Sequence, residues 1–365
     1  EITGSTAAII APEIWGGMYG LTTFTQLVAW DNSSTTTPAT PATSTSGSRS
    51  RRSASRYATP FIACVPVVIV DTPRYPWRGL LVDTANHFIP VKDLLTTIDA
   101  LAMNKMNVFH WHIVDSYSYP MVSQVYPELS RNGAWAKEDV YTVDDVTQVI
   151  EHANNNGVRV VAEFDTPGHC YSLGLTFPNI TVSCDGVNTD TDIGPINIVP
   201  IDPSNNFTYT VVEKLLGEFA SRFQDQFLHV GGDELQTDCW EASKKIKTFM
   251  AKTNMKTMTE LQSYFEKKML KMVTNLNKTA IVWADSFQAV PKSLPPDTVI
   301  EVWQNITLLN EALLAGHDTL LALGWYLDRQ QPVDNESSWF WLDTWEQMYN
   351  VDPDSYISPT SSSSS

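Results

Sequence analysis

Short apolar runs that alternate with helical patterns constrain the fold of this chain more than any other feature. Each run is long enough for one strand and ends in polar or aromatic residues. Strands that alternate with helices are typical of repeated βα units, which build a parallel sheet. The pattern predicts an α/β fold, a TIM-type (β/α)8 barrel without its eighth strand, whose candidate strands lie in 78–84, 106–115, 157–165, 227–234, 279–287, 298–305 and 319–327.

The stretches outside these strands differ sharply in character. In 91–105, VKDLLTTIDALAMNK, the residues Leu94, Leu95, Ile98 and Leu101 follow the spacing of one buried helical face. Residues 32–59 are instead a Ser/Thr/Pro/Arg-rich tract without apolar periodicity, which we interpret as a disordered insert, and 351–365 is a low-complexity tail. Within the insert, the basic residues from Arg49 to Arg52 suggest a site for a processing protease, with a merely solvated linker as the alternative.

Charge and sequons limit the partner and the compartment. The formal net charge is -17 at pH 7, so no basic face remains to neutralise nucleic acid or an anionic membrane. No apolar run approaches the roughly 18 residues that a transmembrane helix needs. Acceptor sequons for N-glycosylation predict a protein of the secretory pathway, lysosomal or extracellular; they lie at Asn32, Asn179, Asn206, Asn277, Asn305 and Asn335.

The cysteines leave their pairing open. Cys64, Cys170, Cys184 and Cys239 allow three full pairings, which sequence alone does not rank. They are too few for a disulfide scaffold, and they lack the CxxC spacing of a structural zinc site.

The stretch FLHVGGDELQTDCW, 227–240, places two glycines and the adjacent carboxylates of Asp233 and Glu234 at the end of an apolar run. Neighbouring anions repel, so one keeps its proton to a higher pH and can donate it to a leaving oxygen, as glycoside hydrolysis requires. An exposed acidic strand end is the alternative. The active site of a barrel lies at the carboxyl ends of its strands, which here carry Asp83, Asp115, Asp165, Asp233, Glu234, Asp285, Trp303, Tyr326 and Asp328.

Aromatic residues and a histidine lie near the same strand ends. Trp283, Trp303, Trp325 and Tyr326 offer flat apolar walls of the kind that suit a sugar ring. Core packing is the alternative, for Trp325 or for whichever of these residues point outward. His169 follows a strand on the Pro-Gly turn of FDTPGHC, where it could pair with a carboxylate such as Asp115.

A metal site is the competing hypothesis for the histidines. His110 and His112 alternate to one face of a strand and could hold an ion together with His169, His229 or Asp233. Against it, both precede the end of their strand by several residues, whereas metal ligands would converge at strand ends. For each histidine alone, a satisfied core position is the simpler interpretation, and we expect no metal and no cofactor.

Several motifs, in a fixed order between residues 16 and 328, resemble glycoside hydrolase family 20, the β-N-acetylhexosaminidases. They are VVIVDTPRYPWRG, RGLLVDTANHFIP, NVFHWHIVDSYSYP, VRVVAEFDTPGH, HVGGDEL and GWYLD. The resemblance implies an exo-β-N-acetylhexosaminidase that removes terminal non-reducing β-linked GlcNAc or GalNAc from oligosaccharides, glycoproteins or glycolipids. It also implies substrate-assisted retaining hydrolysis, in which the 2-acetamido oxygen attacks the anomeric carbon and gives an oxazolinium intermediate.

The resemblance further implies a role for each matching residue. Glu234 would be the general acid/base, while Asp233 would orient the acetamide N–H and stabilise its positive charge. Asp115 and His169 would support Glu234. The other implied assignments are sugar-binding residues Arg78, Trp283, Trp303, Tyr326 and Asp328, and a disulfide between Cys184 and Cys239.

The chain departs from the family's pattern near both ends. Residues 1–31 would be a remnant of a larger N-terminal α/β domain, its last strand and helix, and Tyr19 to Thr22 replace the usual Arg-Gly-Leu-Glu. The catalytic barrel, expected over 60–350, would lack the eighth strand with its Trp-x-Glu, since Trp345-Glu346 lies in a helical pattern. An inactive sugar-binding fragment is therefore one alternative function, and a metal-dependent hydrolase is another. A partner chain, as in a homodimer, could lend the missing strand.

Overall fold

The computed structural model describes residues 1–3, 6–31, 59–184, 187, 196, 199–327 and 344–357. The chain forms two compact units, residues 1–76 and 77–365. The first contains helix α1 (Ile14–Gln26) and strands β1 (Val28–Asp31) and β2 (Thr59–Ile62), which pair antiparallel. Helix α1 is the helix expected within 1–31. In the described residues before it, isolated bridges at Ile2 and Ala7 stand where a strand was expected. The barrel sheet begins later, at Gly79.

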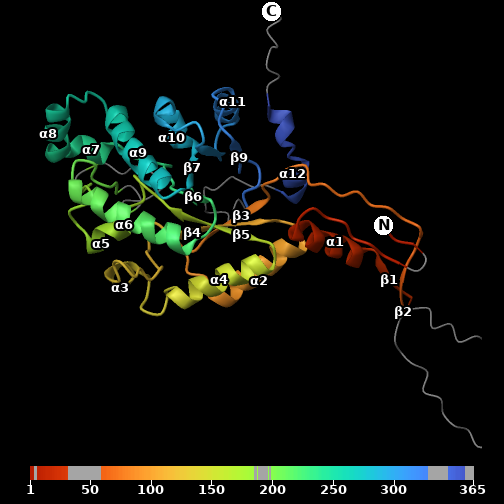
Figure 1. Ribbon diagram of the computed structural model, residues 1–365. Helices are drawn as coiled ribbons and strands as arrows, with labels where there is room; N and C mark the ends of the chain where they lie inside the picture. The colour runs from red at the N-terminus through yellow and green to blue at the C-terminus, as the bar shows by residue number, and fades with distance from the viewer. Residues whose placement is uncertain are drawn as a thin grey trace, which may run out of the picture. The chain divides into compact units, whose positions relative to one another are not determined.

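The second unit is built on one curved parallel sheet. Within the residues described above, its strands lie in the order of the chain, from β3 to β9, and each pairs in parallel with the next. Each of the seven strands expected for the barrel is confirmed, and the sheet is an open barrel (Figure 1). The strands are β3 (Gly79–Asp83), β4 (Val108–Val114), β5 (Arg159–Phe164), β6 (Phe227–His229), β7 (Thr279–Trp283), β8 (Val299–Val302) and β9 (Thr319–Leu321).

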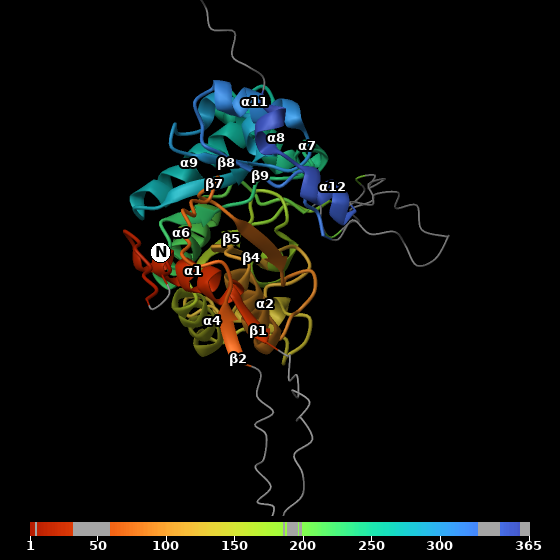
Figure 2. The same cartoon turned by 90° about the vertical axis from the view of Figure 1, so that its right-hand side faces the viewer.

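Helices follow most of the strands and cover the outer face of the sheet. Figure 2 shows the strands between α2 and α4 on one side and α9 and α11 on the other. The larger helices are α2 (Val91–Met103), α4 (Val143–Asn155), α6 (Asn206–Arg222), α8 (Lys244–Thr253), α9 (Met258–Asn275) and α11 (Ile306–Leu314). Shorter ones are α3 (Glu128–Gly133), α5 (Tyr171–Thr176), α7 (Asp238–Ala242), α10 (Ala284–Ala289), α12 (Trp345–Asn350) and the 3-10 helices η1 (Pro291–Ser293) and η2 (Pro353–Tyr356).

Local sequence explains where the main helices begin and which face they bury. Thr142 and Thr257 each accept a hydrogen bond from the backbone three residues on, where Asp145 and Glu260 bond back, so α4 and α9 start with capping boxes. Helix α2 buries Leu94, Ile98 and Leu101, three of the four residues predicted for its inner face, and Leu95 is half-buried.

The two faces of the sheet carry different side chains. In β4, Phe109, Trp111 and Ile113 belong to the large apolar cluster that includes the covering helices. The alternate residues Val108, His110 and His112 point the other way, because side chains alternate along a strand. All of these side chains are buried, so the inner face of the sheet is a second interior, apolar at one end and polar at the other.

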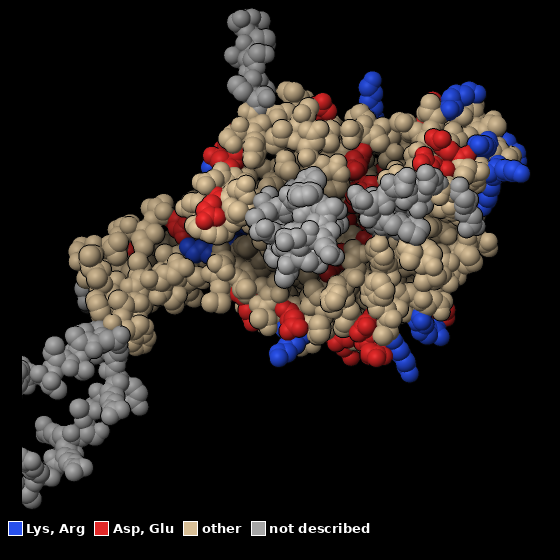
Figure 3. Space-filling model, turned by 180° about the vertical axis from the view of Figure 1, so that it is seen from behind, with Lys and Arg blue, Asp and Glu red and all other residues tan. Residues whose placement is uncertain are grey.

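Strands β3 and β9 are the ends of the sheet in the part of the chain that the structure describes. Trp345 and Glu346 begin helix α12, as their pattern predicts, and Trp345 is 72% exposed. No helix among the described residues is long and apolar enough to span a membrane. In Figure 3, acidic side chains are visible in the hollow of the face that is shown and also along its rim, where most of the basic side chains lie.

Candidate active site

The turn after β6 carries the two adjacent carboxylates, and its two glycines are sterically required. Gly231 and Gly232 have positive φ angles of 72° and 103°. A Cβ on Gly231 would lie 1.6 Å from Asp165 Oδ1, and a Cβ on Gly232 would lie 2.0 Å from Ser286 Oγ. The missing Cβ atoms thus let side chains from β5 and α10 reach the turn from two sides, and Asp165 Oδ1 accepts the Gly232 N–H at 2.9 Å.

Two functional candidates have left-handed backbones. Glu234 has φ 49° and His169 has φ 51°, conformations that cost residues with a side chain about 1–3 kcal/mol. Such strain concentrates at functional sites, where the surrounding structure holds it. The cost indicates that both side chains are aimed at a particular place.

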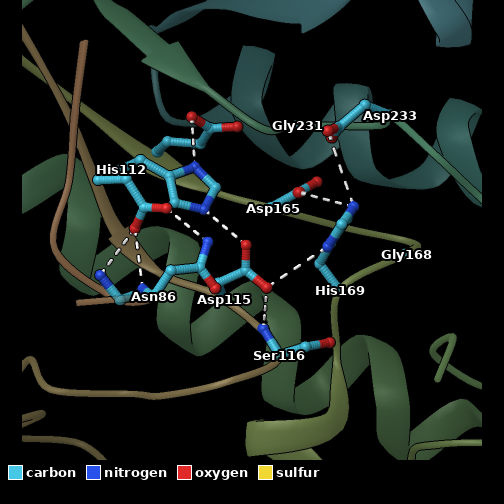
Figure 4. A network of polar contacts seen from close by, with 12 residues as sticks. Asn86, His112, Asp115, Ser116, Asp165, Gly168, His169, Gly231 and Asp233 are labelled. Atoms are coloured by element: carbon cyan, nitrogen blue, oxygen red, sulfur yellow. Dashed lines mark hydrogen bonds and ion pairs between the residues drawn. The ribbon is translucent and has the colours of Figure 1, made fainter. Parts of the chain in front are cut away.

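That place is a cluster around His169, which the structure assembles as the sequence predicts. His169 Nδ1 lies 3.4 Å from Asp115 Oδ1, and its Nε2 lies 3.7 Å from both Asp233 Oδ2 and Glu234 Oε2. Asp165, which the sequence places at a strand end without a role, lies 3.9 Å from the same Nε2. Figure 4 shows His169 between Asp115 and Asp233, with Asp165 beside it.

The charges in this cluster shift the pKa values of its members in different directions. Burial, and then the neighbouring Asp233, raise the pKa of Glu234, so the carboxyl keeps its proton to a higher pH. Burial works against charge on His169, but Asp233, Asp165 and Asp115 outweigh it and raise its pKa well above the ordinary value. For Asp115 the signs are opposite. Burial raises the pKa of this carboxyl, but His169 and His112 outweigh burial and keep the pKa low.

A deeper polar layer lies behind this cluster, and its central carboxylate, Glu163, was not predicted from the sequence. Glu163 accepts hydrogen bonds from His110 Nε2, His112 Nδ1 and the Trp283 indole N–H, each at 2.8 Å. His112 Nε2 also bonds Asp115 Oδ2 at 2.8 Å. Glu163 lies two residues before Asp165 on β5, and this same-face spacing is the pattern that could have revealed it.

Aromatic side chains line one side of the site. Trp303 donates from Nε1 to Asp285 Oδ2 at 2.8 Å, and its ring lies 6.5 Å from those of Trp283 and Tyr326, centre to centre. Asp285 Oδ1 in turn accepts the Glu234 N–H at 3.3 Å. A cavity of about 380 Å³ adjoins these residues and is lined by Gly232, Glu234, Leu235, Gln236, Gln262, Asp285, Ala289 and Gln304.

Other predicted residues lie elsewhere. Arg78 immediately precedes β3, and its Nε donates to the carbonyl of Lys105 at 2.8 Å. Lys105 precedes β4, so this bond lies at the amino ends of the strands, whereas Glu234 follows the carboxyl end of β6. Cys184 and Cys239 form the expected disulfide. Asn179, Asn206, Asn277 and Asn305 are exposed, as glycosylation would require. Several predictions fall outside the described residues: Asp328, the sequons at Asn32 and Asn335, the basic cluster 49–52, residues 32–58 of the insert and residues 358–365 of the tail.

The buried histidines bear on the metal hypothesis. His110, Glu163 and His229 bring possible ligand atoms within 4.8 Å of one another, as do His169, Asp233 and Glu234. His110 and His112, however, do not converge on one open position, because each directs a ring nitrogen at the same oxygen of Glu163. Their bonds are those of satisfied interior residues.

Comparison with known proteins decides the family. The pattern of the glycosyl hydrolase family 20 catalytic domain matches residues 75–364. The chain belongs to this family. Beta-hexosaminidase subunit A2 of Dictyostelium discoideum is 36% identical over 355 residues, which cover 96% of this chain and 59% of that protein. Beta-hexosaminidase subunit beta of Homo sapiens is 36% identical over 352 residues, 95% of this chain and 56% of that one.

A solved family 20 structure supports the same assignment. The chitobiase of Flavobacterium johnsoniae superimposes with a TM-score of 0.68 at 28% identity, over 87% of this chain and 44% of that one. This family 20 chain therefore spans just over half the length of the curated relatives and less than half of the chitobiase.

Proposed function

We propose that the protein is an exo-β-N-acetylhexosaminidase that hydrolyses terminal non-reducing β-linked GlcNAc or GalNAc with retention. Its membership of family 20 and the names of its relatives support this reaction class. The observation that carries the proposal is the placement of Asp233 and Glu234 on one turn, each with an oxygen 3.7 Å from His169 Nε2.

The two carboxyls would serve different partners. Glu234 donates a proton to the leaving oxygen, because its pKa is raised and the carboxyl is 28% exposed at the site. Asp233 accepts the acetamide N–H and stabilises the positive charge that develops when the acetamide oxygen attacks the anomeric carbon. His169 and Asp115 then orient Glu234 and take part in its change from acid to base.

The aromatic side would hold the sugar. Trp283 and Trp303 form walls for the acetamide group and the sugar ring, and Tyr326 donates a hydrogen bond to the acetamide oxygen. Arg78 and Asp328 remain the proposed ligands of the ring hydroxyls. The disulfide and the exposed sequons are compatible with the secretory pathway, so we propose a lysosomal or extracellular protein. The relatives are named as subunits, so we also propose that the chain forms a dimer.

Turnover of matched chromogenic sugars tests the function. The N-acetyl-β-glucosaminide should be hydrolysed and the plain β-glucoside should be nearly inert, because only the former carries the attacking acetamide. Equal turnover of the two would overturn the substrate-assisted scheme, and turnover of neither would overturn the assignment as a hexosaminidase.

A further inference from the structure

Glu266 is a buried carboxyl that the proposed mechanism does not use. It lies on α9 with no exposed surface, and its Oε2 has no hydrogen-bond partner among the described residues. A charged carboxylate in such a place is costly unless it is paired. Among the described residues no cation pairs with Glu266, so a neutral, protonated carboxyl is the form that fits this position.

The other oxygen of this carboxyl reaches the turn that carries the catalytic pair. Glu266 Oε1 lies 2.8 Å from Ser286 Oγ, which lies 3.4 Å from the carbonyl oxygen of Gly232. Gly232 immediately precedes Asp233. Glu266 is thus two contacts away from the backbone that sets the direction of both carboxyls.

The hydrogens available decide which of these contacts can exist together. A serine hydroxyl has one hydrogen and can donate it either to Glu266 or to Gly232. If Glu266 is a neutral acid, its own O–H donates to Ser286 Oγ, and the hydroxyl is left to donate to the Gly232 carbonyl. If Glu266 is ionised, the hydroxyl turns to the carboxylate and the carbonyl loses this donor.

We propose that Glu266 is a positioning residue that, as a neutral acid, donates to Ser286 and thereby fixes Gly232 and the turn bearing Asp233 and Glu234. The proposal rests on the proposed function, since it gives the turn its catalytic role. It predicts that ionisation of Glu266 loosens the turn and lowers turnover without removing any group that touches the sugar.

The surroundings of Glu266 favour the neutral form near neutral pH. Burial raises its pKa to about 7, although Ser286 and Gln262 act in the opposite direction. Charged groups on the adjoining elements bond elsewhere: Asp285 accepts from Trp303, Glu218 pairs with Arg222, and Lys268 lies over the Tyr209 ring. The remaining charged groups of these elements and of α9 itself are exposed: Glu213, Lys214, Glu260, Lys267, Lys271 and Lys292. On the turn after β6, Asp233 and Glu234 lie near His169.

The sign of the pH effect follows from the two states. The pKa of Glu266 is about 7 in the folded protein against an ordinary value of 4.5. Between these values the unfolded chain releases the proton and the folded protein retains it, so stability is full below 4.5 and falls as the pH rises to 7. Turnover responds later, because the turn loosens only when folded Glu266 ionises, above about pH 7.

The experiment compares Glu266→Gln and Ser286→Ala with wild type, and uses the exposed Glu213→Gln as the matched control. For each, kcat and KM on the chromogenic N-acetylglucosaminide and the thermal midpoint are measured from pH 4 to pH 9. Glu266→Gln keeps an N–H donor to Ser286 at every pH. It should therefore match wild type in acid but retain turnover above pH 7, and the fall in its thermal midpoint between pH 4.5 and 7 should be smaller.

Ser286→Ala should lower kcat at every pH with KM unchanged, because the Gly232 carbonyl has lost the hydroxyl donor. Glu213→Gln should behave as wild type throughout. Identical pH dependences for wild type and Glu266→Gln, or an unaltered kcat in Ser286→Ala, would overturn the proposal.

A direct titration covers the case in which Glu266→Gln fails to fold. Carboxyl carbon NMR on wild type labelled at glutamate should show one carboxyl that titrates near pH 7 and whose signal persists in Glu234→Gln and in Glu213→Gln. If every glutamate other than Glu234 has titrated by pH 5.5, the neutral acid does not exist. The NMR and melting results also stand if no hexosaminidase activity is found, so failure of the proposed function is distinguished from failure of this one.

Discussion

The interior of the curved sheet is built differently at its two ends. Toward the amino ends of the strands, Val108, Val161, Ile281 and Val299 pack as an apolar cluster. Two residues further along the same strands, the buried side chains are His110, Glu163, Trp283 and Glu301. The change takes one side-chain layer, about 7 Å along a strand.

This difference separates stability from chemistry. The apolar layer stabilises the fold through burial alone, at roughly 25 cal/mol per Å² of apolar surface. The polar layer is costly to bury unless its groups pair, and Glu163 accepts from three donors for that reason. Substitutions in the two layers should therefore fail in different ways.

The largest effect is expected at the polar end, from Glu234→Gln. The variant should lose several orders of magnitude in kcat, because the leaving oxygen loses its proton donor, and general acid catalysis contributes about 10²–10⁴-fold. Asp233→Asn should also lower kcat strongly while sugar binding persists. Steady-state kinetics with the exposed Asp238→Asn as control checks both, and turnover of Glu234→Gln close to that of the control would remove Glu234 from the mechanism.

A smaller loss, about 100-fold in kcat, is expected for His112→Gln, because a misplacement of about 1 Å at a reacting group has that cost. Both ring nitrogens of His112 lie 2.8 Å from a carboxylate oxygen, of Glu163 and of Asp115, which raise its pKa despite burial. Glutamine cannot donate in both directions from the same position, so Asp115 and then His169 lose their alignment. KM should change little, and wild-type kcat in a folded His112→Gln would show that the deeper layer is only structural.

The sequence sufficed for the fold because the strands alternate with helices in chain order. Strands that are adjacent in the sheet are also consecutive in the chain, so the strand order follows from the sequence order. The polar ends of those strands then located Asp115, His169, Asp233 and Glu234 together.

What the sequence did not reveal depends on distances across the sheet. Glu163 and Ser286 look like ordinary strand and helix residues until β5, β6 and α10 are placed side by side. The role of Arg78 stays a prediction from its motif, and its Nε donates to the Lys105 carbonyl before β4. The sequence also attributed the raised pKa of Glu234 to the adjacent Asp233 alone, whereas in the structure burial raises this pKa more than Asp233 does.

At the apolar end, Ile281→Val should lower the free energy of unfolding by about 1 kcal/mol, because a methylene is lost from a fully buried side chain. Activity per folded molecule should not change, since Ile281 belongs to the apolar cluster and not to the polar layer. Denaturant unfolding together with kinetics at a temperature well below the melt checks this. A drop in kcat with unchanged stability would show that the two layers are mechanically coupled.

The smallest effect is expected from His152→Gln, which removes the same chemical pair as His112→Gln but at the surface. His152 Nε2 lies 2.6 Å from Asp99 Oδ1, between helices α4 and α2, and the two side chains are 31% and 54% exposed. Water already solvates both groups, so the loss should be below about 1 kcal/mol and should shrink with added salt. Unfolding in low and high salt measures it, with kcat expected to stay at the wild-type value. If His152→Gln lowered kcat as much as His112→Gln, burial between two carboxylates could not explain the importance of His112. The contrast between the polar layer and the surface would then be wrong.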